Sequence, residues 1–193
     1  MPFDSLATAP DEGLLALYAG GDRAAAAELA RRFLPRMLAY AARLLRDRTE
    51  AEDVAQEAML RLWRIAPDWR EGTARLSTWL YRVVTNLCTD RLRRRRSLPL
   101  DAAPEPVDPA RGAEAGMIAA DRAAALEIAL GSLPDRQRQA VVLRHIEGLS
   151  NPEIAVVMEI GVEAVESLTA RGRRALTAAL AGQREALGYD AED

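Results

Sequence analysis

The chain has 193 residues, a formal net charge of −3, one cysteine and one histidine, and it is long enough for one large domain or two small ones. A single cysteine cannot form an intramolecular disulfide, and neither CxxC nor HExxH occurs, so we expect no metal site. No apolar run reaches membrane-spanning length and no secretory signal opens the chain, so we expect a cytoplasmic protein without membrane insertion.

Two helical stretches are expected in the first 45 residues. The first spans Asp11–Ala19 and ends at the helix-breaking pair Gly20 and Gly21. Asp22 can cap the next helix, whose apolar stripe runs to Pro35 and resumes after it. Because proline has no backbone N–H to donate, we expect a break or a kink at this position.

A further helix carries a candidate docking face for another protein. Thr49 and Glu52 have the spacing of a capping box, which predicts a helix from Glu50 to about Ile65. A tryptophan and an outward leucine among acids suit an interface hot spot. The alternative is an ordinary solvated acidic face. The candidate docking residues are Asp53, Gln56, Glu57 and Trp63.

The stretch 66–76 predicts a loop rich in tryptophan and arginine. It contains Trp69, Arg70 and Arg75 and leads directly into the next helix. Such a loop could capture a flipped base. It could equally be an ordinary connection with Trp69 turned inward.

Residues 77–97 predict a helix with two faces of opposite character. Leu80, Val84 and Leu87 lie on an apolar stripe, which Val83 and Cys88 widen. The opposite face combines an aromatic ring, amide and hydroxyl groups and guanidinium charge, a mixture that suits phosphates, unstacked bases and base edges. A solvated basic helix end is the alternative. The residues of this face are Trp79, Arg82, Asn86, Thr89 and Arg93, followed by Arg94, Arg95 and Arg96.

The negative net charge does not exclude nucleic acid, because the charges are unevenly distributed. Between Arg70 and Ser97 there are eight arginines and only two acids, Glu71 and Asp90. The other acids lie outside this segment, among them those of the following stretch and the C-terminal tail. We therefore expect a local basic surface on an acidic chain.

Catalysis has few candidate residues. Cys88 lies on the apolar stripe and is expected to be a small core residue. His145 follows an apolar run near a helix end, where a packing or capping role is expected. Acid–base and nucleophilic catalysis therefore have few candidates, and we expect no catalytic residue, no cofactor and no small-molecule substrate.

Composition changes at residues 98–116, where prolines alternate with acids and no helical periodicity remains. This pattern predicts a flexible acidic linker between two helical domains, 11–97 and 117–182.

The second domain ends in a predicted helix-turn-helix. Ser150 and Glu153 form a second capping box, which opens a helix at Asn151–Met158. A three-residue turn then leads to a longer helix, Val162–Ala181. An αα-hairpin of no particular function is the alternative. The outward residues of the longer helix are Glu163, Glu166, Ser167, Arg171, Arg173 and Arg174.

Three segments stand out together: EAEDVAQEAMLRLWR at 50–64, STWLYRVVTNLCTDRLRRRRS at 77–97 and LPDRQRQAVVLRHIEGLSNPEIA at 133–155. In this order and spacing they resemble the hallmark segments of bacterial extracytoplasmic function (ECF) sigma factors of the sigma-70 family. The resemblance covers about residues 11–181. It implies an all-α protein with a σ2 helix bundle, a linker and a σ4 helix-turn-helix domain. It also implies an activity that is not enzymatic, namely binding to core RNA polymerase and directing it to promoter DNA, and an anti-sigma factor as a partner.

The resemblance assigns roles by position. The docking residues named above match the family's contact with the clamp helices of the largest catalytic subunit of polymerase. Trp79, Asn86 and Thr89 match positions that meet the melted minus-10 strand, and Arg75, Arg82 and Arg93 complete the predicted minus-10 set. The outward residues of 162–181 form the predicted minus-35 set. Two departures bear on the minus-35 sequence. The family's Lys-Ser-Arg reads Glu166-Ser167-Leu168, and Glu159 occupies the usual position of the turn glycine, with Gly161 nearby.

Two rival functions remain at this point. A free-standing helix-turn-helix regulator would bind duplex DNA without polymerase and usually as a dimer on paired half-sites. A helical adaptor that does not touch DNA would leave the two opposite faces of residues 77–97 unexplained.

Overall fold

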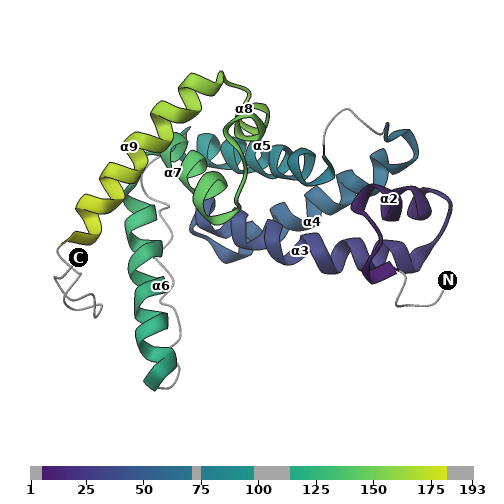
Figure 1. Ribbon diagram of the computed structural model, residues 1–193, viewed down its shortest axis with the longest axis horizontal. Coiled ribbons are helices and arrows are strands. Elements are labelled where there is room, and N and C mark those ends of the chain that lie inside the picture. The colour runs from purple at the N-terminus through teal and green to yellow at the C-terminus, as the bar shows by residue number, and fades with distance from the viewer. Residues whose placement is uncertain (1–5, 71–74, 98–113, 182–193) are drawn as a thin grey trace. The chain divides into compact units, whose positions relative to one another are not determined.

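The computed structural model describes residues 6–70, 75–97 and 114–181, with side chains from residue 122 onward in the last range. All regular elements in these ranges are helices, which confirms the all-α prediction (Figure 1). The chain divides into two compact units, Met1–Leu100 and Asp101–Asp193. No helix in the described ranges combines the length and apolarity needed to cross a membrane.

The first unit is a helix bundle. α3 packs against both α4 and α5, α4 packs against α5, and α2 lies on α3 and the short η1 turn. Its elements are α2 (Asp11–Ala19), α3 (Arg23–Leu45), α4 (Arg48–Ile65), the 3₁₀ turn η1 (Ala66–Asp68) and α5 (Leu76–Ser97).

Helix α3 begins as predicted but is not interrupted. Oδ1 of Asp22 accepts hydrogen bonds from the amides of Ala24 and Ala25, at 2.8 and 3.3 Å. Pro35 lies inside the helix on its exposed side, so of the predicted break or kink the break is wrong. Packing supplies the reason, since Phe33 and Met37 on either side of the proline are buried and hold both halves against the core.

Helix α4 begins two residues earlier than predicted. Oδ1 of Asp47 accepts from the amide of Glu50 at 2.9 Å, so Asp47 is the N-cap and α4 starts at Arg48. The proposed Thr49–Glu52 capping box is therefore wrong. Glu52 instead pairs with Arg48 one turn away, with Oε1 and Nε 3.0 Å apart.

Helix α5 buries most of the predicted apolar stripe, with Leu87 only half-buried, and it buries further residues as well. Leu80, Val84 and Cys88 are fully buried. Tyr81 and Thr85, which the apolar pattern did not include, are buried as well. The hydroxyl groups of Thr85 and Tyr40 of α3 are hydrogen-bonded at 2.8 Å, and the rings of Tyr40 and Tyr81 meet edge to face with centroids 5.3 Å apart. A polar pair satisfied inside the bundle thus fixes α5 on α3.

The second unit contains four α-helices and a π-helical turn in its described residues. Helix α6 starts at Glu114, so the last three residues of the predicted 98–116 linker are helical, while residues 98–113 lie outside the described ranges. The elements are α6 (Glu114–Ser132), α7 (Asp135–Val141), the π turn η3 (Val142–Ile146), α8 (Asn151–Met158) and α9 (Val162–Ala181).

The helices α8 and α9 have the predicted bounds. The amide of Ser150 donates to Oε2 of Glu153 at 2.8 Å, as the capping box requires. Glu159 ends α8 with φ of 54° and ψ of 49°, in the left-handed region that usually favours glycine. Its N–H donates to the carbonyl oxygen of Ala155.

Helix α9 crosses α7 at a glycine. Gly172 is buried, and a Cβ atom added there would lie 2.5 Å from Cγ2 of Val141 and 3.3 Å from the carbonyl oxygen of Gln137. Only a residue without a side chain allows this approach. The sequence analysis did not single out Gly172.

Candidate nucleic-acid interface

The outward face of α5 is centred on Trp79. This half-buried ring meets Trp69 edge to face, with centroids 5.9 Å apart and an interplanar angle of 85°. Asn86, Thr89 and Arg93 are exposed further along the helix, and Arg82 is half-buried. These groups share one side of α5, as the helical spacing predicted.

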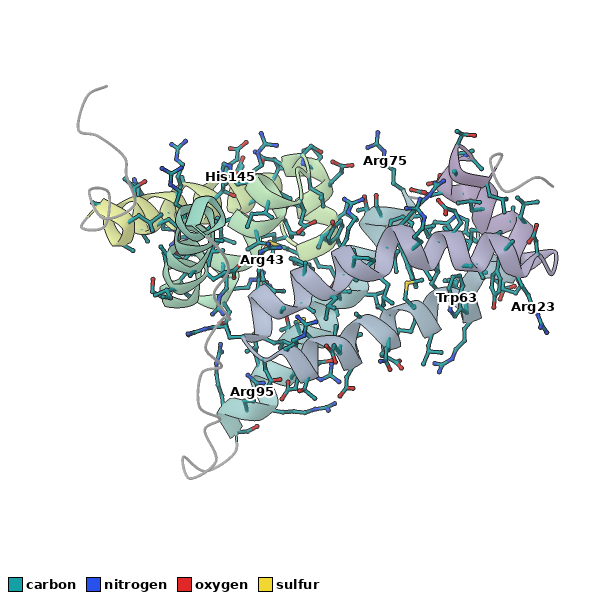
Figure 2. All side chains as sticks on the ribbon, turned by 90° about the horizontal axis from the view of Figure 1, so that it is seen from below. Arg23, Arg43, Trp63, Arg75, Arg95 and His145 are labelled. Atoms are coloured by element: carbon teal, nitrogen blue, oxygen red, sulfur yellow. The ribbon has the colours of Figure 1, made fainter. Side chains whose placement is uncertain are left out.

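Trp69 lies behind this face rather than in solvent. The residue is half-buried, and its Nε1 atom is buried with no hydrogen-bond partner in the described part of the chain. Trp69 therefore contacts Trp79 from a half-buried position. Arg75 is exposed just before α5 and projects away from the helices (Figure 2). The stretch 71–74 of the proposed base-capturing loop lies outside the described residues.

The run of arginines at the end of α5 is not uniform. Arg95 turns back onto the bundle, donating from Nη1 to the carbonyl oxygen of Leu45 at 2.9 Å (Figure 2). Its Nη2 lies 3.1 Å from Oδ2 of Asp47 and 2.9 Å from Oε1 of Glu50. Arg91, one turn earlier, donates to the backbone carbonyl of Glu50 at 3.3 Å. These two arginines fasten α5 to the α3–α4 corner.

The other arginines of the run face outward. Arg93 and Arg94 are exposed, and Arg93 pairs with Asp90 on its own helix, at 3.3 Å. An exposed pair of this kind is weak and leaves the guanidinium accessible to phosphate.

The other end of α5 has a capping group that sequence reasoning missed. The amide of Leu76 donates to Oε1 of Glu12, at 3.2 Å. Glu12 belongs to α2 and lies 64 residues earlier in the chain. Local sequence patterns cannot reveal a cap supplied over such a separation.

The candidate docking face lies on α4. Asp53 and Gln56 are exposed, and Leu60 beside them is 49% exposed. Glu57 is half-buried and accepts from Nε of Arg61 at 2.8 Å, and this hydrogen bond is the main reason why the pKa of Glu57 is lowered.

Trp63 is only partly available on that face. Its ring packs against Tyr18 of α2, with centroids 4.7 Å apart and planes at 54°. The residue is half-buried (Figure 2), so one side contacts α2 and the remainder is accessible.

All the predicted outward residues of α9 are exposed. Nδ2 of Asn151 on α8 donates to Oε1 of Glu166 at 3.4 Å, and Nε of Arg171 donates to the carbonyl oxygen of Ser167 at 3.3 Å. Glu166 is thus oriented by α8 and not by Arg173 or Arg174 of its own helix. The exposed residues are Glu163, Glu166, Ser167, Arg171, Arg173 and Arg174.

Cys88 and His145 are the two side chains that the sequence analysis considered for catalysis. Cys88 is buried, and burial raises the pKa of its thiol to about 12. His145 is exposed on the η3 turn rather than packed, and partial desolvation followed by Arg144 and Arg173 lowers its pKa. Among the described residues, no cluster of three or more His, Cys, Asp or Glu side chains could hold a metal ion.

Comparison with known proteins bears on both units. Residues 29–98 match the family model for Sigma-70 region 2, and residues 123–176 match the model for Sigma-70, region 4. The chain is 37% identical over 166 residues to the ECF RNA polymerase sigma factor SigM of Mycobacterium tuberculosis, covering 86% of this chain and 82% of SigM. It belongs to the ECF sigma factors.

A further relative and a solved structure agree with this membership. The sigma factor is 38% identical over 171 residues to the ECF RNA polymerase sigma factor SigE of Mycolicibacterium smegmatis, covering 85% of this chain and 66% of SigE. Its fold is similar to that of CnrH, solved in complex with the cytosolic domain of CnrY, with a TM-score of 0.65 and 28% identity. That match covers 89% of this sigma factor and 97% of CnrH.

The region 2 match contains α4, α5 and most of α3 but begins after α2. Glu12 and Tyr18 of α2 therefore lie outside the residues that the Sigma-70 region 2 model matches. The region 4 match contains α7, α8 and most of α9, including Gly172.

Proposed function

We propose that this sigma factor docks on core RNA polymerase through α4, reads the melted minus-10 strand with α5 and reads the minus-35 duplex with α9. Residues 98–113 would connect the two promoter-binding units. The observation that carries the proposal is the outward face of α5, where a supported tryptophan, an amide and arginines lie together in a sigma-70 region 2.

The free energy needed to open promoter DNA is larger than α5 alone can supply. Opening a DNA duplex costs about 1.4 kcal/mol per stacked step, whereas stacking one base on an aromatic ring returns about 1–3 kcal/mol. A single platform at Trp79 can hold one or two opened bases but cannot open a whole transcription bubble. Polymerase must contribute the remaining free energy, so docking and promoter opening belong together.

The α4 face has the composition of a protein interface. Asp53 and Gln56 offer polar contacts around the exposed Leu60, and the accessible part of Trp63 adds aromatic surface. Glu57, whose pKa is lowered by the hydrogen bond from Arg61, offers a carboxylate that can meet a basic partner. We assign this face to the clamp helices of polymerase.

In the minus-35 reader, Glu166 contributes specificity more than affinity. A carboxylate can accept a hydrogen bond from the amino group of cytosine but is repelled by phosphate. The contact with Asn151 holds Glu166 near the turn of the helix-turn-helix. Arg171, Arg173 and Arg174 lie further along α9, where they can reach phosphate or guanine.

A protein inhibitor is the expected regulator. CnrH was solved with the cytosolic domain of CnrY, so a chain of similar fold binds a protein partner. We propose an anti-sigma factor as the corresponding partner here, and the cytoplasm as the place of action.

The decisive experiment combines binding to core polymerase with run-off transcription. The wild-type chain should co-purify with core polymerase and start transcription at a cognate promoter. The double variant Asp53→Ala/Gln56→Ala should bind core polymerase at least tenfold more weakly while keeping its melting temperature. Asp68→Ala, at an exposed carboxylate outside the face, is the control and should bind normally. Unchanged core affinity in the double variant would remove the α4 assignment.

The same assay tests the rival regulator. A free-standing helix-turn-helix protein would bind promoter duplex as a dimer and show no dependence on polymerase. That result would overturn the proposed function as a whole.

A further inference from the structure

Helix α2 supplies a charged cap to the helix that reads DNA. The first amides of any α-helix lack partners within the helix, and Leu76 is the first residue of α5. Oε1 of Glu12 accepts from the Leu76 amide at 3.2 Å, in a partly buried position. The negative carboxylate also interacts favourably with the positive end of the helix dipole.

Helix α2 is itself firmly anchored. Arg32 of α3 donates to Oδ1 of Asp11 at 2.7 Å and to the carbonyl oxygens of Leu6, Ala7 and Ala9 at 2.8–2.9 Å. Glu28 accepts from Nε of Arg32 at 2.7 Å, and hydrogen bonds from Arg31 and Arg32 lower the pKa of Glu28 to about 2. The cap on Leu76 therefore comes from a fixed element.

The same helix also holds the end of α4. Tyr18 packs on Trp63, so α2 contacts the chain on both sides of the segment that joins α4 to α5. The intervening turn η1 lies against α2 as well. Trp69 directly follows this turn, and its ring packs against the ring of Trp79.

We propose that α2 is a positioning element for promoter opening, and that Glu12 is its positioning residue. The inference rests on the proposed reading of the melted strand by Trp79. Trp79 lies three residues after Leu76, and its amide donates to the carbonyl oxygen of Arg75 at 3.1 Å in the first turn of α5. Without the Glu12 cap this turn frays, and the Trp79 ring loses its fixed place against Trp69.

The expected size follows from helix capping. Removing a capping side chain costs about 1 kcal/mol, which corresponds to about a fivefold change in an equilibrium. Glu12→Ala should therefore reduce affinity for a single-stranded minus-10 probe, measured with core polymerase present, by about fivefold. Glu12→Gln keeps an acceptor oxygen but loses the charge, and its loss should be about half as large on a logarithmic scale.

Two measurements in parallel test the proposal, with Ala16→Gln at an exposed position of α2 as the control. The first is hydrogen exchange of the Leu76 amide in the free protein. It should be slow in the wild type and the control, intermediate in Glu12→Gln and fast in Glu12→Ala. The second is the probe affinity, together with binding to a duplex that carries only the minus-35 element, which should not change.

The outcomes separate this inference from the function on which it rests. If Glu12→Ala binds the minus-10 probe as well as the wild type does, while Trp79→Ala binds it weakly, α2 is not a positioning element. If Trp79→Ala also binds normally, the assignment of Trp79 fails first. Unchanged exchange at Leu76 in Glu12→Ala would overturn the cap itself. An equal loss of binding to the minus-35 duplex would show general damage and overturn the positioning role.

Discussion

The two helices assigned to promoter DNA are held in place by different means. Helix α5 is fastened at both ends by side chains from other helices, with Glu12 at Leu76 and Asp47 and Glu50 at Arg95. Helix α9 buries only Val165 and Gly172, and Gly172 lets it approach α7 closely.

The difference matches the two targets. A melted strand is flexible, so its reader must offer side chains that are already ordered, and Trp79 is held by Trp69. Duplex DNA is itself ordered, so a helix that is rigidly placed can read it with exposed side chains such as Arg173 and Arg174. In α5 an aromatic ring is held by a second aromatic ring, whereas the outward side chains of α9 are all exposed and have at most single hydrogen bonds within the described residues, such as that of Glu166 with Asn151.

The substitution with the largest expected effect adds a side chain at Gly172, where α9 packs against α7. Gly172→Val would place atoms against Val141 and the Gln137 carbonyl, and overpacking of this kind costs about 3 kcal/mol. Hydrogen exchange of the α7 and α9 amides under urea should show this loss. Gly161→Ala, where an added Cβ meets nothing within 4 Å, is the control. A stable Gly172→Val variant would mean that α9 is held by other contacts.

Removal of the Trp79 ring tests whether an ordered side chain on α5 contributes to promoter opening. Trp79→Ala should weaken open-complex formation by about 2 kcal/mol, because only an unstacked base can use the ring, and should leave the initial duplex complex nearly unchanged. Trp69→Ala keeps the Trp79 ring but removes the ring that packs against it, so open-complex formation should weaken by about 1 kcal/mol. Potassium permanganate footprinting against gel-shift affinity measures the two steps. A larger effect for Trp69→Ala would make Trp69 the base-stacking residue.

A matched pair of substitutions separates fastening from DNA contact at the end of α5. Arg95→Met keeps the aliphatic stem but leaves Asp47, Glu50 and the Leu45 carbonyl without its guanidinium, so it should lower the unfolding free energy by about 1 kcal/mol. Arg94→Met should leave stability unchanged and reduce the slope of log affinity against log salt by about 1. Equal salt slopes for the two variants would contradict the assignment of a structural role to Arg95 and a DNA contact to Arg94.

The smallest effect concerns the turn that sets the angle between α8 and α9. Glu159 adopts a left-handed conformation that glycine tolerates better, so Glu159→Gly should stabilise the second unit by about 0.5 kcal/mol. Gly148→Ala, at φ of 74°, should instead destabilise the second unit by about 1 kcal/mol. Thermal denaturation of the two variants would show both signs. A destabilising Glu159→Gly would mean that the side chain makes a favourable contribution in the turn.

Local patterns predicted a large part of this structure. The bounds of α2, α8 and α9 follow from caps, glycines and apolar spacing within a few residues. The outward faces of α5 and α9 follow from helical periodicity in the same way. The family resemblance named the roles of those faces, and the family itself is shown by the comparisons.

The errors and omissions have one physical origin, which is tertiary contact. Pro35 does not break α3 because buried neighbours hold the helix, and periodicity alone cannot weigh that packing. Tyr81 and Thr85 are buried because Tyr40 satisfies and covers them from another helix. Arg95 looks like its neighbours in the sequence and differs from them only through contacts with the α3–α4 corner.

Burial of Cys88 has a practical consequence for spectroscopy. The chain has one cysteine, and its thiol, with a pKa raised to about 12, is almost entirely protonated at the pH of maleimide coupling. A cysteine introduced at an exposed position, such as Asn86→Cys on α5, would therefore be the group that takes up a fluorophore. The native thiol need not be removed first, so the bundle that Cys88 helps to fill stays intact while a dye reports the arrival of the opened strand.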